Sequence, residues 1–223
     1  MRISAIVPTL REARRIAAIV ATLQEEVDEV VVADGGSDDG TGERALAIGA
    51  RVVQSAPGRG PQLNAGAATA TGDILWFVHA DTRVPPGSGC ALRRAAEAAP
   101  WGCFDVRVDS RDPRLRWAGR WMGGRAKLTG SATGDMAIWA KRSFFEALGG
   151  YAPLPALEDL DFTERARKLA RGAVVPVRVG TSARRWEEEG VTRTMGRMWA
   201  IRLAWRLGWD AEELATWYRS QPR

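Results

Sequence analysis

Short apolar runs alternate with helical patterns through the first half of the chain, and this alternation constrains the fold more than any other feature. The runs predict strands at Ile3–Val7, Glu29–Ala33, Arg51–Gln54 and Asp73–Val78. The apolar spacings between them predict helices at Glu12–Leu23, Thr41–Ile48 (with Thr41 as its N-cap) and Gln62–Ala70. Strands joined by helices of this length form right-handed crossovers, so we expect an α/β domain with a mainly parallel sheet.

The second half of the chain is less regular. Strands are expected at Cys103–Val108, Met136–Trp139 and Val174–Val179. Helices are expected at Leu115–Leu128, with an interruption at Gly123-Gly124, and at Ser143–Leu148, Leu157–Leu169 and Val191–Trp209. No repeat and no low-complexity linker divides the sequence, so we expect one domain over residues 1–223. Within it, residues 1–100 are expected to resemble a nucleotide-binding fold, residues 101–180 to form a more specialised second half, and residues 181–223 to form a C-terminal helical extension.

Composition excludes several classes of protein. Of the 223 residues, 45% are hydrophobic and 26% are charged, which is the balance of a globular protein and not of a disordered one. Two cysteines, Cys90 and Cys103, are too few for a disulfide framework or a four-ligand zinc site. No run approaches the ~18 apolar residues of a membrane span, and Met1–Leu10 predicts a short strand rather than a secretion signal. We therefore expect a cytoplasmic location.

The formal net charge of +5 comes from one stretch. Residues 107–127 hold seven basic side chains and two acidic ones, so the rest of the chain is close to neutral. Two interpretations stay open: a patch that attracts an anionic partner, or a solvated arginine-rich helix face. No nucleic acid is expected as a partner, because the stretch lacks a recognisable reading motif.

Polar residues follow each of the first four predicted strands. In a parallel sheet the carboxyl ends of the strands meet at one edge, where ligands bind. The loops there are Pro8–Glu12, Asp34–Thr41, Pro57–Gly60 and His79–Thr82. None of them carries the dinucleotide fingerprint, the lysine of a P-loop, or the glycine and glutamate of a calcium loop. The sequence therefore predicts a ligand cleft of another kind at this edge.

Five segments resemble the family 2 glycosyltransferases, which have the GT-A fold. They are Pro8–Ile16, Val31–Thr41, Gly58–Thr82, Thr133–Tyr151 and Leu157–Leu169, in the order and spacing of the family. The finer resemblance is to bacterial transferases encoded beside radical-SAM and selenium-related genes. The resemblance implies a mainly parallel central sheet flanked by helices, with further helices at the C-terminus. It also implies a nucleoside diphosphate sugar as donor and a hydroxyl group as acceptor.

The resemblance implies a donor site at the first three loops. Asp34 would accept hydrogen bonds from the base or the ribose, with Glu12 on the other side of the nucleoside and Gly36 allowing close approach of the backbone. Arg59 would meet the diphosphate or the base. Two alternatives stay open: Asp34 and Asp39 form a turn and a helix cap, and Arg59 is a surface side chain. The full donor set that we expect is Pro8, Thr9, Glu12, Asp34, Gly36, Arg59, Asn64, His79, Ala80 and Asp81.

His79-Ala80-Asp81 stands where the family has its D-x-D motif. The resemblance implies that Asp81 binds a divalent cation, Mn²⁺ or Mg²⁺, which neutralises the charge on the diphosphate leaving group. His79 departs from the pattern, since it replaces the first aspartate and is the only histidine of the chain. It is expected as a second metal ligand, for which Mn²⁺ is the better ion, or as a contact to ribose or phosphate. A satisfied, partly buried histidine is the remaining alternative.

Glu158-Asp159 opens the predicted helix Leu157–Leu169. The acceptor hydroxyl must lose a proton as it attacks, and the resemblance implies Asp159 as the general base with Glu158 in support. The alternative is that both carboxylates only complement the helix dipole. The residues that the resemblance implies on the acceptor side are Gly134, Asp135, Arg185 and Trp186.

The last predicted helix, Val191–Trp209, has Arg202 and Arg206 within its apolar face. A membrane-surface helix would segregate these charges, so we expect packing against the domain or against a partner chain, which includes a homodimer. Peripheral contact with the inner membrane surface, where a lipid-linked acceptor would lie, is the alternative.

The residues and the resemblance together predict an inverting, metal-dependent glycosyltransferase. Two rivals remain. A nucleotidyltransferase would need a glycine-rich, basic signature that Pro8–Glu12 lacks. A non-catalytic nucleotide-sugar-binding module would account for the absence of aspartate at positions 35 and 79.

Overall fold

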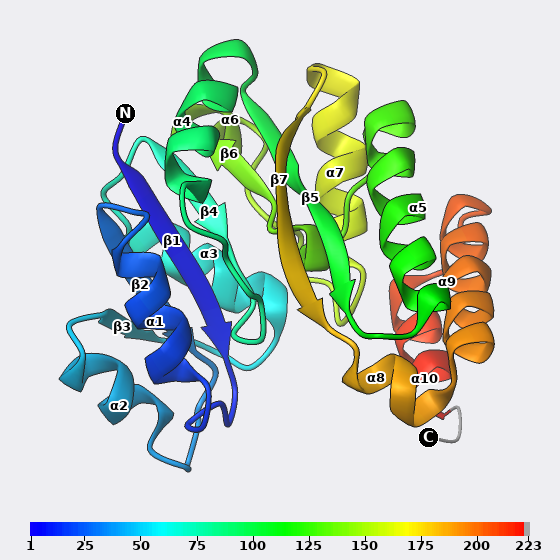
Figure 1. Cartoon of the computed structure of the whole chain (residues 1–223), viewed down its shortest axis with the longest axis horizontal. Helices are drawn as coiled ribbons and strands as arrows, with labels where there is room; N and C mark the ends of the chain where they lie inside the picture. The colour runs from blue at the N-terminus through cyan, green and yellow to red at the C-terminus, as the bar shows by residue number, and fades with distance from the viewer. Residues whose placement is uncertain (221–223) are drawn as a thin grey trace.

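The computed structural model describes residues 1–220, which form one mixed sheet with helices on both faces. The strands are β1 (Ile3–Thr9), β2 (Glu29–Asp34), β3 (Arg51–Gln54), β4 (Ile74–Phe77), β5 (Trp101–Asp109), β6 (Trp139–Lys141) and β7 (Ala173–Ser182). Their order in the described part of the chain is β3-β2-β1-β4-β6-β5-β7 (Figure 1). Only β6 runs antiparallel to its neighbours, β4 and β5. The expectation of a mainly parallel sheet is confirmed.

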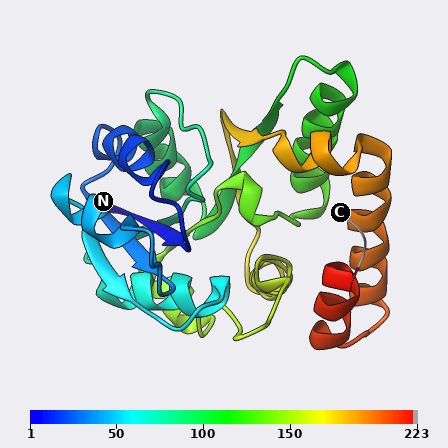
Figure 2. The ribbon, with the colours of Figure 1, turned by 90° about the horizontal axis from the view of Figure 1, so that it is seen from below.

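Helices cover the two faces of the sheet and extend beyond its C-terminal half. They are α1 (Ile16–Gln24), α2 (Thr41–Ala47), α3 (Arg59–Thr69), α4 (Ser88–Ala98), α5 (Pro113–Thr129), α6 (Arg142–Ala147), α7 (Glu158–Leu169), α8 (Arg184–Glu189), α9 (Val191–Arg206) and α10 (Ala211–Ser220), with a 3₁₀ turn η1 (Gly134–Met136). Figure 2 shows α1 and α4 on one face, α3 and α7 on the other, and α9 and α10 at the far end.

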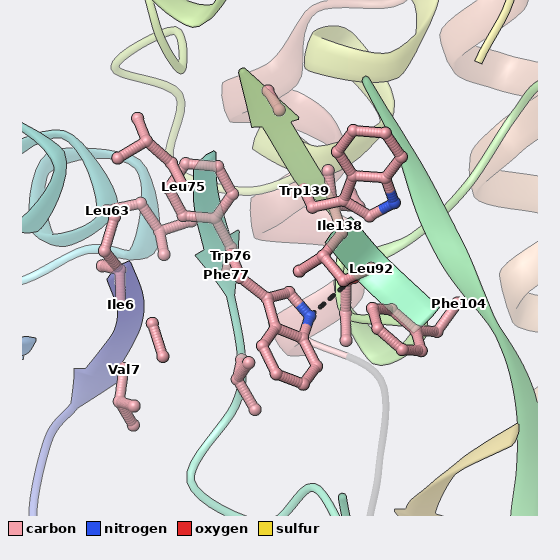
Figure 3. Packing of buried hydrophobic residues seen from close by; sticks show 14 of the residues in the cluster. Ile6, Val7, Leu63, Leu75, Trp76, Phe77, Leu92, Phe104, Ile138 and Trp139 are labelled. Atoms are coloured by element: carbon pink, nitrogen blue, oxygen red, sulfur yellow. Dashed lines mark hydrogen bonds between the residues drawn. The ribbon is translucent and has the colours of Figure 1, made fainter. Parts of the chain in front are cut away.

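Buried aromatic residues join the two halves of the sheet. Trp76 of β4 stacks on Phe104 of β5 with ring centroids 4.8 Å apart, and its Nε1 donates a hydrogen bond of 3.3 Å to the carbonyl oxygen of Ala137 (Figure 3). Trp139 of β6 is completely buried beside them. Burial of one such side chain contributes roughly 2–3 kcal/mol. This packing fixes the end of β4 and the segment before β6, which both lead into the candidate site.

Most of the predicted helices are found with ends shifted by a few residues, such as α1, which begins at Ile16, and α3, which begins at Arg59. Two expected local features are absent. Gly123-Gly124 does not interrupt α5, which runs continuously through both glycines. Gly123 has a packing role instead, because a Cβ there would overlap the carboxylate of Asp105 on β5. The glycine lets the helix lie close to the strand. Thr41 is not the N-cap of α2, since Gly40 takes that position in a left-handed conformation with φ 83° and Thr41 is the first helical residue.

Three helices, α4, α8 and α10, were not predicted, and one strand is shifted toward the C-terminus from its expected position. β6 begins at Trp139, because Met136 belongs to η1. Periodicity missed α4 and α10. The buried side of α4 is made largely of small residues, and a Cβ at Gly89 would overlap the carbonyl oxygen of Glu26. α4 therefore packs through close backbone approach and shows little apolar periodicity in the sequence.

The C-terminal helix α9 packs against the rest of the chain, which is one of the expected arrangements. The rings of Trp199 on α9 and Trp121 on α5 lie 5.3 Å apart. Trp205 Nε1 donates a hydrogen bond of 3.2 Å to Glu164 on α7, and Arg206 Nε lies 3.8 Å from the same carboxylate. Among the helices of residues 1–220, none has the length and apolar character needed to cross a bilayer.

Candidate active site

The turn after β2 is held by Asp34, which is only 1% exposed. Its carboxylate accepts hydrogen bonds from the hydroxyls of Thr9 and Ser37, the backbone N–H of Ser37 and the side-chain amide of Gln54. These bonds fill the ~four acceptor positions that a carboxylate offers. Asp34 therefore fixes the turn, which agrees with the alternative that this carboxylate has a structural role. A nucleoside would have to displace one of these donors to contact it.

Gln62 ties together the ends of β1 and β2, a role that no motif around it predicts. This residue of α3 donates hydrogen bonds of 2.6 Å and 2.9 Å to the carbonyl oxygens of Thr9 and Ala33. Pro8 and Thr9 lie at the end of β1 beside it. Gly36, with φ 92°, has open space where a side chain would be, so a ligand can approach the backbone there.

The loops after β1 and β2 are joined through Asp39 and Thr41. Asp39 accepts hydrogen bonds from the backbone N–H groups of Ala13 (3.1 Å) and Thr41 (3.2 Å). The hydroxyl of Thr41 accepts the N–H of Glu12 at 2.9 Å, and the Glu12 carboxylate lies 2.9 Å from Arg15. Asp39 thus stabilises the turn before α2, and Glu12 is placed beside the loop that contains Asp34.

Asn64 positions the segment that leads to α7. Its Nδ2 donates to the carbonyl oxygen of Tyr151 at 2.8 Å, and its Oδ1 accepts the N–H of Tyr151 at 2.9 Å. A Cβ at Gly150 would lie only 2.7 Å from the same Oδ1. Each end of the amide thus has a bond to the backbone of Tyr151 and keeps one further hydrogen-bonding position. Asn64 holds this segment in place, and its contact with a donor stays a prediction.

The residues after β4 lie against η1. The His79 side chain is 17% exposed, and its Nδ1 lies 3.6 Å from Asp135 Oδ1, which is too long for a hydrogen bond. Its ring packs on Gly134, where a Cβ would come within 2.6 Å of Nε2. Ala80 is buried, whereas Asp81 is exposed and has no hydrogen-bond or ion-pair partner among residues 1–220. Asp81 is thus available to a ligand.

Asp159, in the first turn of α7, is oriented by two backbone groups. Its Oδ2 accepts the N–H of Gly134 at 2.7 Å and its Oδ1 accepts the N–H of Leu160 at 2.7 Å. Each oxygen has one protein bond and therefore keeps a further acceptor position. The carboxylate is both fixed in direction and able to accept a proton.

Arg59, the first residue of α3, lies next to the first turn of α7. Its Nη1 lies 3.9 Å from Oε1 of Glu158, and its side chain is 54% exposed. Desolvation lowers the pKa of Arg59, but the negative charges around it outweigh this effect and raise the pKa. The carboxylates that act in this way belong to Glu158, Asp135, Asp159 and Asp81. The charges of these predicted residues, which come from three different segments, therefore all act on one guanidinium.

Glu158 is the buried carboxylate of this group. It is 5% exposed, and burial raises its pKa, with a further increase from the charge of Asp159. Arg59 and His79 oppose the increase without cancelling it. Two neighbouring carboxylates thus differ: Glu158 is desolvated, and Asp159 is half-buried and held by backbone N–H groups.

No cluster of three or more metal-ligating side chains exists among the described residues. This arrangement fits Mg²⁺ or Mn²⁺ nevertheless, because such ions are commonly held by one or two carboxylates together with substrate phosphates and water. Asp81 offers one free carboxylate. His79 faces Gly134 and Asp135 instead, so Asp81 is the residue that best fits a cation arriving with a diphosphate.

The expected acceptor residues are distributed over two places. Gly134 and Asp135 lie beside His79 and Asp159. Trp186 is 8% exposed and packs in a small hydrophobic cluster with Val108, Leu115, Ala183 and Val191. The side chain of Arg185 lies outside the described residues.

The basic stretch is not uniformly solvated. Arg107, Arg114 and Lys127 lie 2.8–3.3 Å from carboxylates of the same region. Arg125 differs, because its three guanidinium nitrogens are buried and have no hydrogen-bond partner in the described part of the chain. The interpretation as a solvated face is wrong for this residue.

Known proteins share both the sequence pattern and the fold. The family model described as Glycosyl transferase family 2 matches residues 4–145. Glucosyl-3-phosphoglycerate synthase of Mycolicibacterium smegmatis is 37% identical over 35% of this chain and 30% of its own length. The enzyme of the same name from Mycobacterium tuberculosis is 36% identical over 35% of this chain and 28% of its own length. The matched part is thus under a third of either curated relative.

Solved structures resemble this chain over a longer span. The crystal structure of TarS 1–349 from S. aureus has a TM-score of 0.66 and 19% identity, and the match covers 82% of this chain and 61% of that one. Glucosyl-3-phosphoglycerate synthase of M. tuberculosis, in complex with Mn²⁺, UDP and glucosyl-3-phosphoglycerate, has a TM-score of 0.58 and 22% identity, with 81% and 70% covered. At these identities the likeness is one of fold.

Proposed function

Because this chain belongs to glycosyl transferase family 2 and has its GT-A fold, we propose that it transfers a sugar from a UDP-linked donor to an acceptor hydroxyl with inversion at the anomeric carbon. The observation that carries the proposal is the 3.9 Å approach of Arg59 to Glu158, next to an Asp159 that the backbone N–H of Gly134 orients. The charges of Asp159 and Asp81 act on the same guanidinium. The finer resemblance to transferases encoded beside radical-SAM genes rests on the sequence motifs alone.

In the proposed reaction the acceptor oxygen attacks the anomeric carbon. The bond from that carbon to the diphosphate breaks, and UDP leaves with the electron pair. The proton of the hydroxyl passes to Asp159, whose two backbone hydrogen bonds hold it ready as an acceptor. Glu158, desolvated and 3.9 Å from Arg59, holds the guanidinium beside the leaving group.

The donor is proposed as a UDP-sugar because solved relatives contain such ligands. Structures of the M. tuberculosis enzyme hold UDP with Mn²⁺ or Mg²⁺, and one structure of TarS holds UDP-GlcNAc. In this chain, Asp81 would hold the cation and Arg59 the diphosphate. The cation would supply positive charge to the departing diphosphate. Gly36 would allow the nucleoside to approach the backbone after β2.

Titration calorimetry with UDP, with and without Mn²⁺, tests the donor site. We expect Mn²⁺ to tighten UDP binding and Asp81→Asn to weaken it by at least about tenfold, because a charged contact is lost. Glu97→Gln, an exposed carboxylate on α4, is the matched control and should bind as the unaltered chain does.

A panel of UDP-sugars, with release of UDP as the readout, then tests transfer. Absence of UDP binding with either metal would overturn the proposal. Release of pyrophosphate from a nucleoside triphosphate, without release of UDP, would instead indicate that the chain is a nucleotidyltransferase.

A further inference from the structure

A hollow with about 40 Å³ of free space lies between α5, α8 and α9. This is several times the ~10–15 Å³ that one water needs. Its walls are largely aromatic and apolar, and two arginines face it. The residues that matter here are Trp121, Arg125, Trp186, Met198, Trp199 and Arg202.

Arg125 is the unusual member of this lining. Its Nε, Nη1 and Nη2 are all buried, and none has a hydrogen-bond partner among the described residues. Burial, together with the charge of Arg202, lowers the pKa of Arg125 to about 10. The group is nevertheless still a cation at neutral pH. A buried cation without a partner is strongly unfavourable, so the fold maintains this charge at a cost.

Arg202 on α9 presents a second cation to the same hollow. It is partly buried, and no carboxylate of the described residues lies within ion-pair distance of it. Its neighbour on the helix, Arg206, lies near Glu164. Burial lowers the pKa of Arg202 as well. Neither arginine has a carboxylate within ion-pair distance among the described residues, although the charge of Asp159 acts on both. An anion in the apolar hollow would give the two guanidinium groups a direct partner.

The hollow lies within electrostatic reach of the proposed base. The charge of Asp159 acts on both Arg125 and Arg202, and the charge of Asp135 also acts on Arg202. Asp159 and Asp135 act on Arg59 as well, together with Glu158 and Asp81. The charge of Asp159 therefore acts both on Arg59, which the proposed function places at the diphosphate, and on the two arginines of the hollow.

We propose that this hollow binds a phosphate group of the acceptor, with Arg125 and Arg202 as its two ligands. The inference rests on the proposed function and names the class of acceptor: a phosphorylated molecule with a free hydroxyl that reaches Asp159. Guanidinium groups form paired, charge-assisted bonds to phosphate. A phosphomonoester carries about −1.5 to −2 at neutral pH, which matches two cations. The surrounding tryptophans would pack on the carbon skeleton.

The same phosphate chemistry occurs on a small phosphorylated polyol and on a lipid headgroup. Binding of glycerol 3-phosphate, measured by calorimetry at constant ionic strength, probes the soluble source. Sedimentation with phosphatidylcholine vesicles, with and without phosphatidic acid, probes the lipid source. Binding in one arm and not in the other identifies the source, and either supports the inference.

The variants Arg125→Met and Arg202→Met test the assignment, with Arg120→Met as control. Arg120 is exposed on the same helix as Arg125 and does not line the hollow. We expect both test variants to weaken binding of the phosphate probe by at least about tenfold, and the control to leave it unchanged. UDP binding with Mn²⁺ should be retained in all three, because none of these residues lies on the donor side.

A thermal melt separates this role from a structural one. Methionine in place of an unpaired buried arginine should leave the melting temperature equal or higher in the absence of phosphate. The stabilisation that the phosphate probe gives to the unaltered chain should disappear in the same variants. Probe binding that survives both substitutions, with UDP binding intact, would overturn this inference alone. Absence of UDP binding in the unaltered chain would overturn the proposed function and the acceptor role with it.

Discussion

The backbone N–H of Gly134 donates a hydrogen bond of 2.7 Å to Oδ2 of Asp159, and the same glycine lies against the ring of His79. One residue of η1 therefore joins the segment after β4 to the first turn of α7. The contact depends on the absence of a side chain, because a Cβ would lie 2.6 Å from His79 Nε2 and 3.6 Å from Asp159 Oδ2.

Gly134→Ala should therefore reduce turnover while the chain still folds. The added methyl must displace the imidazole or η1, and a shift of about 1 Å at a reacting group costs up to about a hundredfold in rate. Gly124→Ala is the matched control, since open space surrounds that position on α5. Steady-state UDP release and circular dichroism are the measurements. Equal turnover in the two variants would mean that η1 does not position Asp159.

Asp159→Asn tests the general base directly. The amide keeps the shape of the side chain but cannot take the proton, so we expect at least roughly a hundredfold loss of turnover. Donor binding should be nearly unchanged. Asp161→Asn provides the comparison, because Asp161 lies in the same helical turn but pairs with Arg165 at 2.8 Å. Equal losses of activity in the two variants would indicate that these carboxylates act only by complementing the helix dipole, and that Asp159 is not the base.

The strands and the edge that carries the site follow from local patterns. Apolar runs such as Glu29–Ala33 are bounded by glycines and polar loops, so their carboxyl ends could be placed before the structure was known. Parallel pairing then brings the loops after β1, β2 and β4 to one edge. The charges of Asp81 and Asp159 both act on Arg59, which agrees with that placement, while their roles remain predictions.

The remaining features depend on tertiary contacts that no local pattern contains. Arg125 looks like one more arginine of a basic helix, and only the packing of α9 across α5 buries it. Gln62 acts by reaching two carbonyl oxygens on separate strands. Asn64 likewise bonds to the backbone of Tyr151, which lies 87 positions away along the chain, and no local pattern predicts this contact.

The two cysteines should differ sharply in reactivity. Burial raises the pKa of the Cys103 thiol to about 12, whereas Cys90 is exposed on α4. The thiolate is the reactive form, so at about pH 8 only on the order of one part in 10⁴ of Cys103 can react. We expect iodoacetamide to modify one thiol per native chain and two after denaturation, as counted by mass spectrometry. Two modifications in the native chain would show that β5 opens readily.

The stability of the chain should depend on pH through Glu158. Burial and the charge of Asp159 raise its pKa in the folded state, so the protonated form is favoured there. The contribution of this group is fully present below its unfolded pKa and is lost as the pH rises through the folded pKa. Glu158→Gln mimics the protonated form, and it should therefore melt at a higher temperature than the unaltered chain at about pH 8, with the difference shrinking toward about pH 5. Glu97→Gln, which changes an exposed side chain of α4, should show no such trend. A melting temperature of Glu158→Gln below that of the unaltered chain at about pH 8 would mean that the ion pair with Arg59 dominates over desolvation.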